Sequence, residues 1–214
     1  DALTPTTRFG CRRLVFSDQY YPLLASGAVQ LEASALVETH GATLVAASGR
    51  RYDDIDLIVL ATGFETNDPP HARLVTGDGG RTLVDHWRDG LSAYASTVVA
   101  GFPNLFVVGG PQSAFAHTSA LMALEQQAGY VARTWTRRIP GQTLRVRPEA
   151  ERAHARLVAA RSASTSFASG CVNWYTRGGR PGVLWPGTVA DFTAMIDAAD
   201  GSEFAVASTI GETA

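Results

Sequence analysis

Two apolar segments that each end in glycine are the clearest candidate positions for ligand chemistry in this sequence. Residues 57–61 (LIVLA) are followed by Thr62 and Gly63, and residues 105–108 (LFVV) are followed by Gly109 and Gly110. In open α/β sheets, ligands bind beyond the carboxyl ends of strands, and glycine lets a cofactor approach the backbone without a Cβ clash. Both turns are therefore candidate cofactor contacts, although a strand followed by a glycine turn also occurs in α/β folds at turns that bind nothing.

A long helical pattern follows the second glycine turn. Five apolar residues recur at helical spacing and would form one face: Leu121, Leu124, Ala128, Val131 and Trp135. Thr118 or Ser119 can cap the start, and Pro140-Gly141 ends the pattern. A helix N-terminus carries about half a unit of positive charge, so this start can stabilise a phosphate or another anion.

Composition and missing motifs exclude several classes of function. With 18 basic and 20 acidic residues the chain shows no sign of nucleic-acid binding, and no apolar run reaches the roughly 18 residues that span a bilayer. It contains no G-x-G-x-x-G or Walker A motif, so it does not encode a complete dinucleotide enzyme. No acidic residue is placed to complete a catalytic triad with Ser113 and His117, so we do not expect a hydrolase. The five histidines show no metal-ligand spacing, so we do not expect a metal site.

The two cysteines, Cys11 and Cys171, are far apart in the sequence and form no C-x-x-C pair. This spacing predicts neither a disulfide nor a redox dithiol, and it fits a reducing, cytoplasmic location. The chain begins at Asp1 without an initiating Met or a signal-peptide pattern. We therefore expect it to be cut from something longer.

The remaining patterns predict an α/β chain. Short β-like runs at residues 14–16, 29–31, 35–39 and 43–46 suggest a small meander. The run 57–61 is apolar on both faces, which suits a buried, parallel strand. Residues 74–76 and 81–83 flank a glycine-rich turn as in a hairpin, and Trp87 ends a short helix. We further predict a helix over Pro148–Ala160, a small-residue linker over 162–170 and a disordered tail from Asp197.

An ordered set of motifs resembles the Baeyer–Villiger and related class B flavin-dependent monooxygenases over about residues 10 to 190. The segments that carry the resemblance are Gly10-Cys11-Arg12-Arg13-Leu14, Asp18-Gln19-Tyr20-Tyr21, residues 56–64 (DLIVLATGF), residues 101–106 (GFPNLF), residues 110–113 (GPQS), Glu125-Gln126-Gln127 and Asn173-Trp174-Tyr175. The A-T-G-F segment alone is only moderately specific, since related flavin monooxygenases share it. The ordered set is much more specific.

The resemblance implies a fold made of two dinucleotide-binding domains, with an NADP domain inserted into an FAD domain. Residues 1–60 would be the end of the NADP domain and the meander, and residues 61–196 the C-terminal part of the FAD domain, before a disordered tail at 197–214. The glycine fingerprints would then lie in a missing N-terminal half. That half is the macromolecular partner we expect.

The family's chemistry implies that reduced flavin and molecular oxygen insert one oxygen atom into a ketone, giving an ester or lactone, with NADPH as reductant. Arg13 matches the position of the family's active-site arginine, and a permanent cation suits stabilising negative charge on oxygen in a dry pocket. From sequence alone an exposed residue at a strand edge is the favoured interpretation of Arg13, and the resemblance reverses that preference.

The resemblance also assigns cofactor contacts. FAD would lie against Thr62, Gly63, Gly110, Pro111, Gln112, His117, Thr118 and Ser119; NADP would lie against Arg12 and Trp174. Ala114 and Thr118 depart from the residues common in the family at these positions. Three alternatives remain open: an S- or N-oxygenating flavin monooxygenase, a disulfide reductase, and a non-catalytic fragment or partner module.

Overall fold

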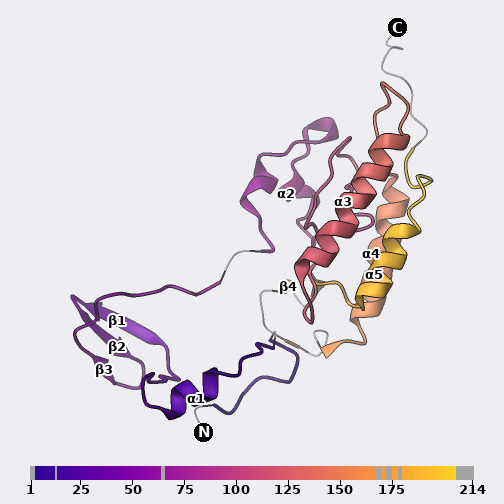
Figure 1. Ribbon diagram of the computed structural model, residues 1–214. Coiled ribbons are helices and arrows are strands. Elements are labelled where there is room, and N and C mark those ends of the chain that lie inside the picture. The colour runs from indigo at the N-terminus through magenta and orange to yellow at the C-terminus, as the bar shows by residue number, and fades with distance from the viewer. Residues whose placement is uncertain are drawn as a thin grey trace. The chain divides into compact units, whose positions relative to one another are not determined.

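The computed structural model describes residues 3–12, 14–63, 66–166, 170–171, 175–177 and 180–205. The chain forms two compact units, shown in Figure 1. The first unit contains Asp1–Thr6 and Val15–Gly63, and the second contains Thr7–Leu14 and Phe64–Ala214. Each unit is described by itself.

The first unit is built on the predicted meander. Strands β1 (Leu36–His40), β2 (Thr43–Ala46) and β3 (Arg51–Tyr52) pair antiparallel in that order, after a short helix α1 (Tyr20–Ala25). Gly41 (φ 60°) and Gly49 (φ 85°) make the turns in left-handed conformations that favour glycine. The β-like runs 35–39 and 43–46 thus predicted β1 and β2 to within one residue, whereas the third strand, β3, was not among the predicted runs.

Glu32 ties the segment before β1 to the rest of the sheet. Its carboxylate accepts hydrogen bonds from the Ser34 hydroxyl (2.7 Å) and backbone N–H (2.9 Å), from the Tyr52 hydroxyl (2.9 Å) and from the Ser48 hydroxyl (3.3 Å). These bonds, those from Ser34 first, lower the pKa of Glu32 to about 2 because they favour the charged form.

The predicted buried strand at residues 57–61 is wrong. This run forms no strand in the described chain, and Leu57, Ile58, Val59 and Leu60 are 78, 44, 78 and 81% exposed. A strand needs a neighbour for its N–H and C=O groups, and no described segment pairs with this run. Residues 14–16 and 29–31, also predicted as β-like, form no strand either.

The second unit is mainly helical. It contains η1 (Pro70–Arg73), η2 (Asp78–Gly80), α2 (Leu83–His86), α3 (Ala120–Arg137), α4 (Pro148–Ser162), β4 (Thr176–Arg177), β5 (Arg180–Pro181) and α5 (Val189–Asp197). Ser119 caps α3 as predicted, because its hydroxyl accepts the Leu121 N–H, and Trp87 is the C-cap of α2. The predicted helix from Pro148 extends two residues further, to Ser162.

The main core lies where α3, α4 and α5 pack alongside one another (Figure 1). Phe192 stacks edge to face on Phe115 and on Trp185, with ring centroids 5.4 and 5.3 Å apart. A second cluster forms around Leu83 on α2 and Trp87, the C-cap of α2. Among the described residues, no helix is both long and apolar enough to cross a bilayer.

The face that α3 buries differs from the predicted one. Ala123, Gln127 and Tyr130 are its buried residues, whereas Leu121 is 72% exposed and Trp135 is about half exposed. The hydrophobic pattern therefore located the helix correctly but oriented it wrongly, because a polar residue, Gln127, occupies the centre of the buried face.

The β structure of the second unit is sparse. The predicted hairpin is confirmed by an antiparallel bridge between Thr76 and Thr82. The predicted strand at residues 105–108 is reduced to one antiparallel bridge between Phe106 and Val98, and Val108 is about half exposed. In the described residues the only parallel pairing is the single bridge between Ala114 and Leu184, so the expected parallel sheet is not seen.

Cys11 and Cys171 form a disulfide, with Cα atoms 5.3 Å apart. The prediction from their spacing was wrong, because the fold brings together two residues separated by 160 positions. The expected reducing location rested partly on unpaired thiols, and that support is lost.

The chain remains ordered beyond Asp197, where a disordered tail was expected. Glu203 is buried and accepts a hydrogen bond from the Tyr130 hydroxyl at 2.7 Å, and burial raises the pKa of Tyr130. The Ala205 N–H donates to the Arg145 carbonyl at 2.7 Å. The tail prediction therefore fails for residues 198–205, and residues 206–214 lie outside the described chain.

Candidate functional site

The turn that follows residues 105–108 is held by contacts that demand glycine. Gly109 has a φ of 73°, and its N–H donates to Gln127 Oε1 at 2.9 Å. A Cβ at Gly110 would lie 2.8 Å from the carbonyl oxygens of both Ser96 and Val107. These oxygens belong to the backbone and cannot move aside cheaply, so this position accepts no larger residue without a shift.

Gln127 connects this turn to helix α3 through a buried polar network. Its side chain is fully buried, and its Nε2 donates to the Ser96 carbonyl at 2.6 Å and to Thr97 Oγ1 at 3.2 Å. The Ser96 hydroxyl in turn donates to the Gln112 carbonyl at 3.1 Å. One glutamine thus fixes both loops that form the site.

Three residues other than glycine adopt left-handed backbone conformations in this network: Ala95 (φ 48°), Ser96 (φ 54°) and Gln112 (φ 54°). Each such residue costs on the order of 1 kcal/mol and persists only where the surroundings determine it. Strain of this kind gathers at ligand sites and switch regions. The hydrogen bonds of Gln127 and Ser96 supply the compensating stabilisation.

The turn is fixed on its other side by the segment that precedes α5. The Gln112 N–H donates to the Gly182 carbonyl at 3.2 Å, and the Ala114 N–H donates to the Val183 carbonyl at 2.9 Å. The Ser113 hydroxyl donates to the Gly110 carbonyl at 2.7 Å. The backbone from Gly110 to Ala114 is therefore held before any ligand arrives.

Several polar groups of the turn have no partner within the described chain. Gln112 Nε2 donates to the Leu91 carbonyl, but Gln112 Oε1 is buried and accepts nothing, and the N–H groups of Gly110 and Ser113 find no acceptor. Buried groups of this kind normally have partners. One acceptor and two donors on a rigid turn can pair with a ligand that presents both hydrogen-bond donors and acceptors.

The start of α3 supplies the other predicted flavin contacts. His117 is exposed and its ring lies 5.8 Å from that of Phe115, while the Thr118 hydroxyl lies 3.6 Å from the sulfur of Met122. Ser119 is also exposed and acts as the N-cap. The helix therefore presents its positive end next to accessible side chains.

The structure brings only part of the predicted site together. Gly110, Pro111 and Gln112 form one buried turn, whereas Arg12 is exposed and makes no hydrogen bond or ion pair in the part of the chain described. Thr62 and Gly63 are exposed in the first unit, and a Cβ at Gly63 would meet nothing within 4 Å.

Arg13 and Trp174 lie outside the described residues. No group of three or more His, Cys, Asp or Glu in the described chain could hold a metal ion.

Sequence reasoning missed the residues that position the turn. Ser96, Thr97 and Gln127 make the network, and only Gln127 belonged to a motif of the resemblance. A usable signal did exist, since Gln127 stands one turn after Ala123 and one turn before Tyr130 on the buried face of α3. A polar residue amid such a face has to find hydrogen-bond partners.

Comparison with known proteins identifies relatives along nearly the whole chain. The chain is 39% identical over 210 residues to a Baeyer-Villiger monooxygenase of Streptomyces coelicolor, covering 95% of this chain and 40% of the relative. It is 36% identical over 217 residues to a Baeyer-Villiger monooxygenase of Pseudomonas aeruginosa, covering 97% of this chain and 40% of that relative. No family model matches the chain.

The fold matches the same group of enzymes. An oxidised steroid monooxygenase bound to NADP is 26% identical, with a TM-score of 0.73, and the match covers 92% of this chain and 39% of that structure. The chain thus spans about 40% of the length of the relatives that it matches. The chain is a homologue of the Baeyer–Villiger monooxygenases and corresponds to a C-terminal portion of these proteins.

Proposed function

We propose that this chain is the C-terminal part of an FAD- and NADPH-dependent monooxygenase that inserts one oxygen atom into a ketone, giving an ester or lactone. The observation that carries the proposal is the strained turn from Gly110 to Gln112. Its backbone is locked by Gln127 while Gln112 Oε1 and two backbone N–H groups are left for a ligand. The homology to Baeyer–Villiger monooxygenases supports the proposal.

Gly110, Pro111 and Gln112 would hold one edge of the flavin, and Gln127 is the positioning residue behind them. The start of α3, with His117, Thr118 and Ser119, would place the positive end of the helix dipole beside negative charge on the reduced ring. Thr62 and Gly63, which are exposed in the first unit, are the remaining residues that the family resemblance assigns to FAD. FAD, when bound, supplies the oxygen-activating chemistry that no side chain of the chain can provide.

Arg13 would supply the fixed cation of the site. A guanidinium remains charged at any physiological pH and stabilises negative charge on oxygen most strongly where water is excluded. Arg12 and Trp174 would contact NADP, Arg12 through a charge-assisted hydrogen bond to phosphate. The phosphate-binding glycine motifs, which this sequence lacks, would come from the remaining N-terminal half of the enzyme.

The test is reconstitution of the enzyme. The chain is co-expressed with the polypeptide encoded upstream of it, and the purified complex is assayed for bound FAD, ketone-dependent NADPH oxidation and ester or lactone product. We expect Arg13→Ala to abolish product while FAD stays bound, and Arg8→Ala, a change in an exposed arginine of the same segment, to preserve both.

A second pair of variants tests the turn itself. Gln127→Leu removes both hydrogen-bonding ends of the buried amide, so we expect at least tenfold weaker retention of FAD, whereas Glu125→Gln on the exposed side of α3 should retain it. A complex that takes up no FAD refutes the proposal. Product formed by Arg13→Ala at the normal rate refutes the role of Arg13, and oxidation of amines or sulfides with no ketone product would indicate an S- or N-oxygenating enzyme instead.

A further inference from the structure

A pocket lined by three arginines lies at the C-terminal end of α3, in the second unit. Its volume is about 270 Å³. The residues that line it come from α3, from the segment after α3 and from the segment after α5: Arg133, Thr134, Arg137, Arg138, Gln142, Leu144, Ala199, Asp200, Gly201 and Phe204. None of them belongs to the proposed flavin turn.

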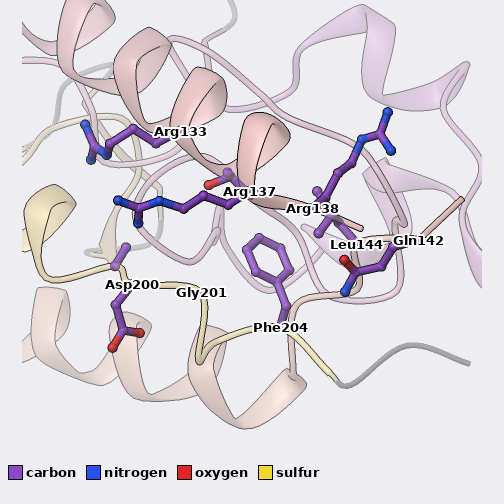
Figure 2. Close-up of a pocket in the computed structure, with 10 residues that line it drawn as sticks. Arg133, Arg137, Arg138, Gln142, Leu144, Asp200, Gly201 and Phe204 are labelled. Carbon is purple, nitrogen blue, oxygen red and sulfur yellow. The ribbon is translucent and has the colours of Figure 1, made fainter. Parts of the chain in front are cut away.

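The guanidinium groups of this pocket have few partners. Arg137 makes no hydrogen bond or ion pair within the described part of the chain. Among the described residues, Arg133 makes two long contacts, 3.4 Å to the Ile196 carbonyl and 3.6 Å to Asp197. Figure 2 shows these two arginines extending to the same side of α3. Several N–H donors of the pair therefore remain available to a ligand.

Arg138 has a different environment. Its guanidinium lies 3.8 Å from the centre of the Trp135 ring, and Figure 2 shows it turned away from Arg133 and Arg137. Its Nε atom is buried without an acceptor in the described chain. Arg138 thus adds positive charge at the rim of the pocket, and the direct contacts fall to Arg133 and Arg137.

The carboxylates near the pocket are partly engaged with other groups. Asp197 lies 3.6 Å from Arg133, and the two oxygens of the buried Glu203 accept from the Tyr130 hydroxyl and from the Gly201 N–H. Asp200 is the only carboxylate that lines the pocket, and one of its oxygens accepts the Ser202 N–H at 2.9 Å. The C-terminus of α3 contributes about half a negative charge. Arg133 and Arg137 are four residues apart on one helix, an arrangement that costs a few tenths of a kcal/mol through like-charge repulsion. A bound anion would remove that repulsion.

An apolar surface adjoins the charged one. Phe204 and Leu144 line the pocket, and in Figure 2 the Phe204 ring lies between Arg137 and Leu144. A volume of about 270 Å³ is at the small end of ligand sites, so it suits a compact molecule. The lining therefore matches a ligand with paired anionic oxygens and a short carbon skeleton.

We propose that this pocket binds a small dianion, a phosphate ester or a dicarboxylate, whose oxygens pair with Arg133 and Arg137 while its carbon atoms contact Phe204. Planar guanidinium groups pair with carboxylate or phosphate oxygens through two parallel hydrogen bonds, which gives both affinity and orientation. The site is separate from the turn at Gly110 and does not depend on flavin.

Isothermal titration calorimetry of the full chain tests the proposal. Pyrophosphate and succinate serve as probes, each measured against sodium chloride at equal ionic strength. The variants are Arg137→Gln, the double variant Arg133→Gln/Arg137→Gln, and Arg156→Gln on α4 as a control that loses one exposed arginine outside the pocket. Circular dichroism verifies that each variant is folded.

We expect saturable binding of at least one probe, at least tenfold weaker in Arg137→Gln, lost in the double variant and unchanged in Arg156→Gln. Binding of pyrophosphate alone would assign a phosphorylated ligand, and binding of succinate a carboxylate. The proposal is overturned if neither probe binds more tightly than chloride, or if a folded double variant binds as well as the original chain. Equal weakening in Arg156→Gln would likewise overturn it, because the effect would then follow net charge rather than the pocket.

Discussion

Glu151 makes the sharpest prediction about the stability of the second unit. This glutamate of α4 is only 4% exposed, yet it accepts three hydrogen bonds from other segments. Its Oε1 accepts from His86 Nε2 at 2.9 Å and from the Ser92 hydroxyl, and its Oε2 accepts from the Ala100 N–H at 2.6 Å. One buried carboxylate thus joins α4 to α2 and to the loop from Ser92 to Ala100.

The change Glu151→Gln keeps the size of the side chain but replaces one acceptor oxygen by an NH2 group. At least one of the three donors then loses its acceptor, which costs about 1 to 3 kcal/mol, and the other bonds lose their charge assistance. Breaking a buried charged network typically costs about 3 to 5 kcal/mol in total. For a chain of 214 residues this corresponds to a fall in Tm of about 10 °C.

The assay is thermal and urea unfolding followed by circular dichroism, with Glu149→Gln as the matched control. Glu149 lies on the same helix and pairs with Arg152 at 3.0 Å, but its side chain is 73% exposed, so its loss should change the unfolding free energy by less than about 1 kcal/mol. If Glu151→Gln falls within that same range, the three hydrogen bonds do not support the fold as argued.

Three further predictions concern other parts of the chain. Burial lowers the pKa of His154 from 6.5 to about 4, so folding favours the neutral ring. The free energy of unfolding should therefore fall by about 3 kcal/mol between pH 6.5 and pH 4. Urea unfolding measured at a series of pH values should show this fall, and His154→Phe should remove it. Hydrogen bonding lowers the pKa of Glu32 to about 2, so its carboxylate should stabilise the meander above pH 4.5 and lose this effect as the pH falls toward 2. Amide hydrogen exchange in β3 should become faster over that range. Glu32→Gln should abolish this pH dependence, whereas Glu38→Gln should not. Gly110→Ala should destabilise by about 1 to 3 kcal/mol through its clash with two carbonyl oxygens. Gly129→Ala within α3 should instead stabilise by up to about 1 kcal/mol, and calorimetric unfolding that ranks the two glycine variants the other way would contradict the packing described for the turn.

Local signals in the sequence predicted the elements that depend on neighbouring residues. Strands β1 and β2 of the meander follow from the short β-like runs 35–39 and 43–46, and the turns follow from Gly41 and Gly49, which adopt left-handed conformations. Helix α3 follows from apolar periodicity and from the cap at Ser119. The order of short motifs also indicated the monooxygenase family, which the relatives support over about 40% of their length.

Features that depend on distant partners were not predictable in this way. The apolar run 57–61 has the composition of a buried strand, but no described segment pairs with it, and burial requires a partner that composition cannot supply. Cys11 and Cys171 are bonded although their spacing indicated nothing, since a disulfide depends on distance in space.

The candidate site shows the same division between sequence and structure. The sequence by itself determined that Gly109 and Gly110 end an apolar run and lead toward a capped helix, because turns and caps are set by residues a few positions apart. Only the tertiary structure decided that Gln127 faces inward and holds that turn in place. A hydrophobic pattern assigns polar residues to the outer face of a helix, and it cannot anticipate a buried amide whose partners come from a loop about thirty residues earlier in the chain.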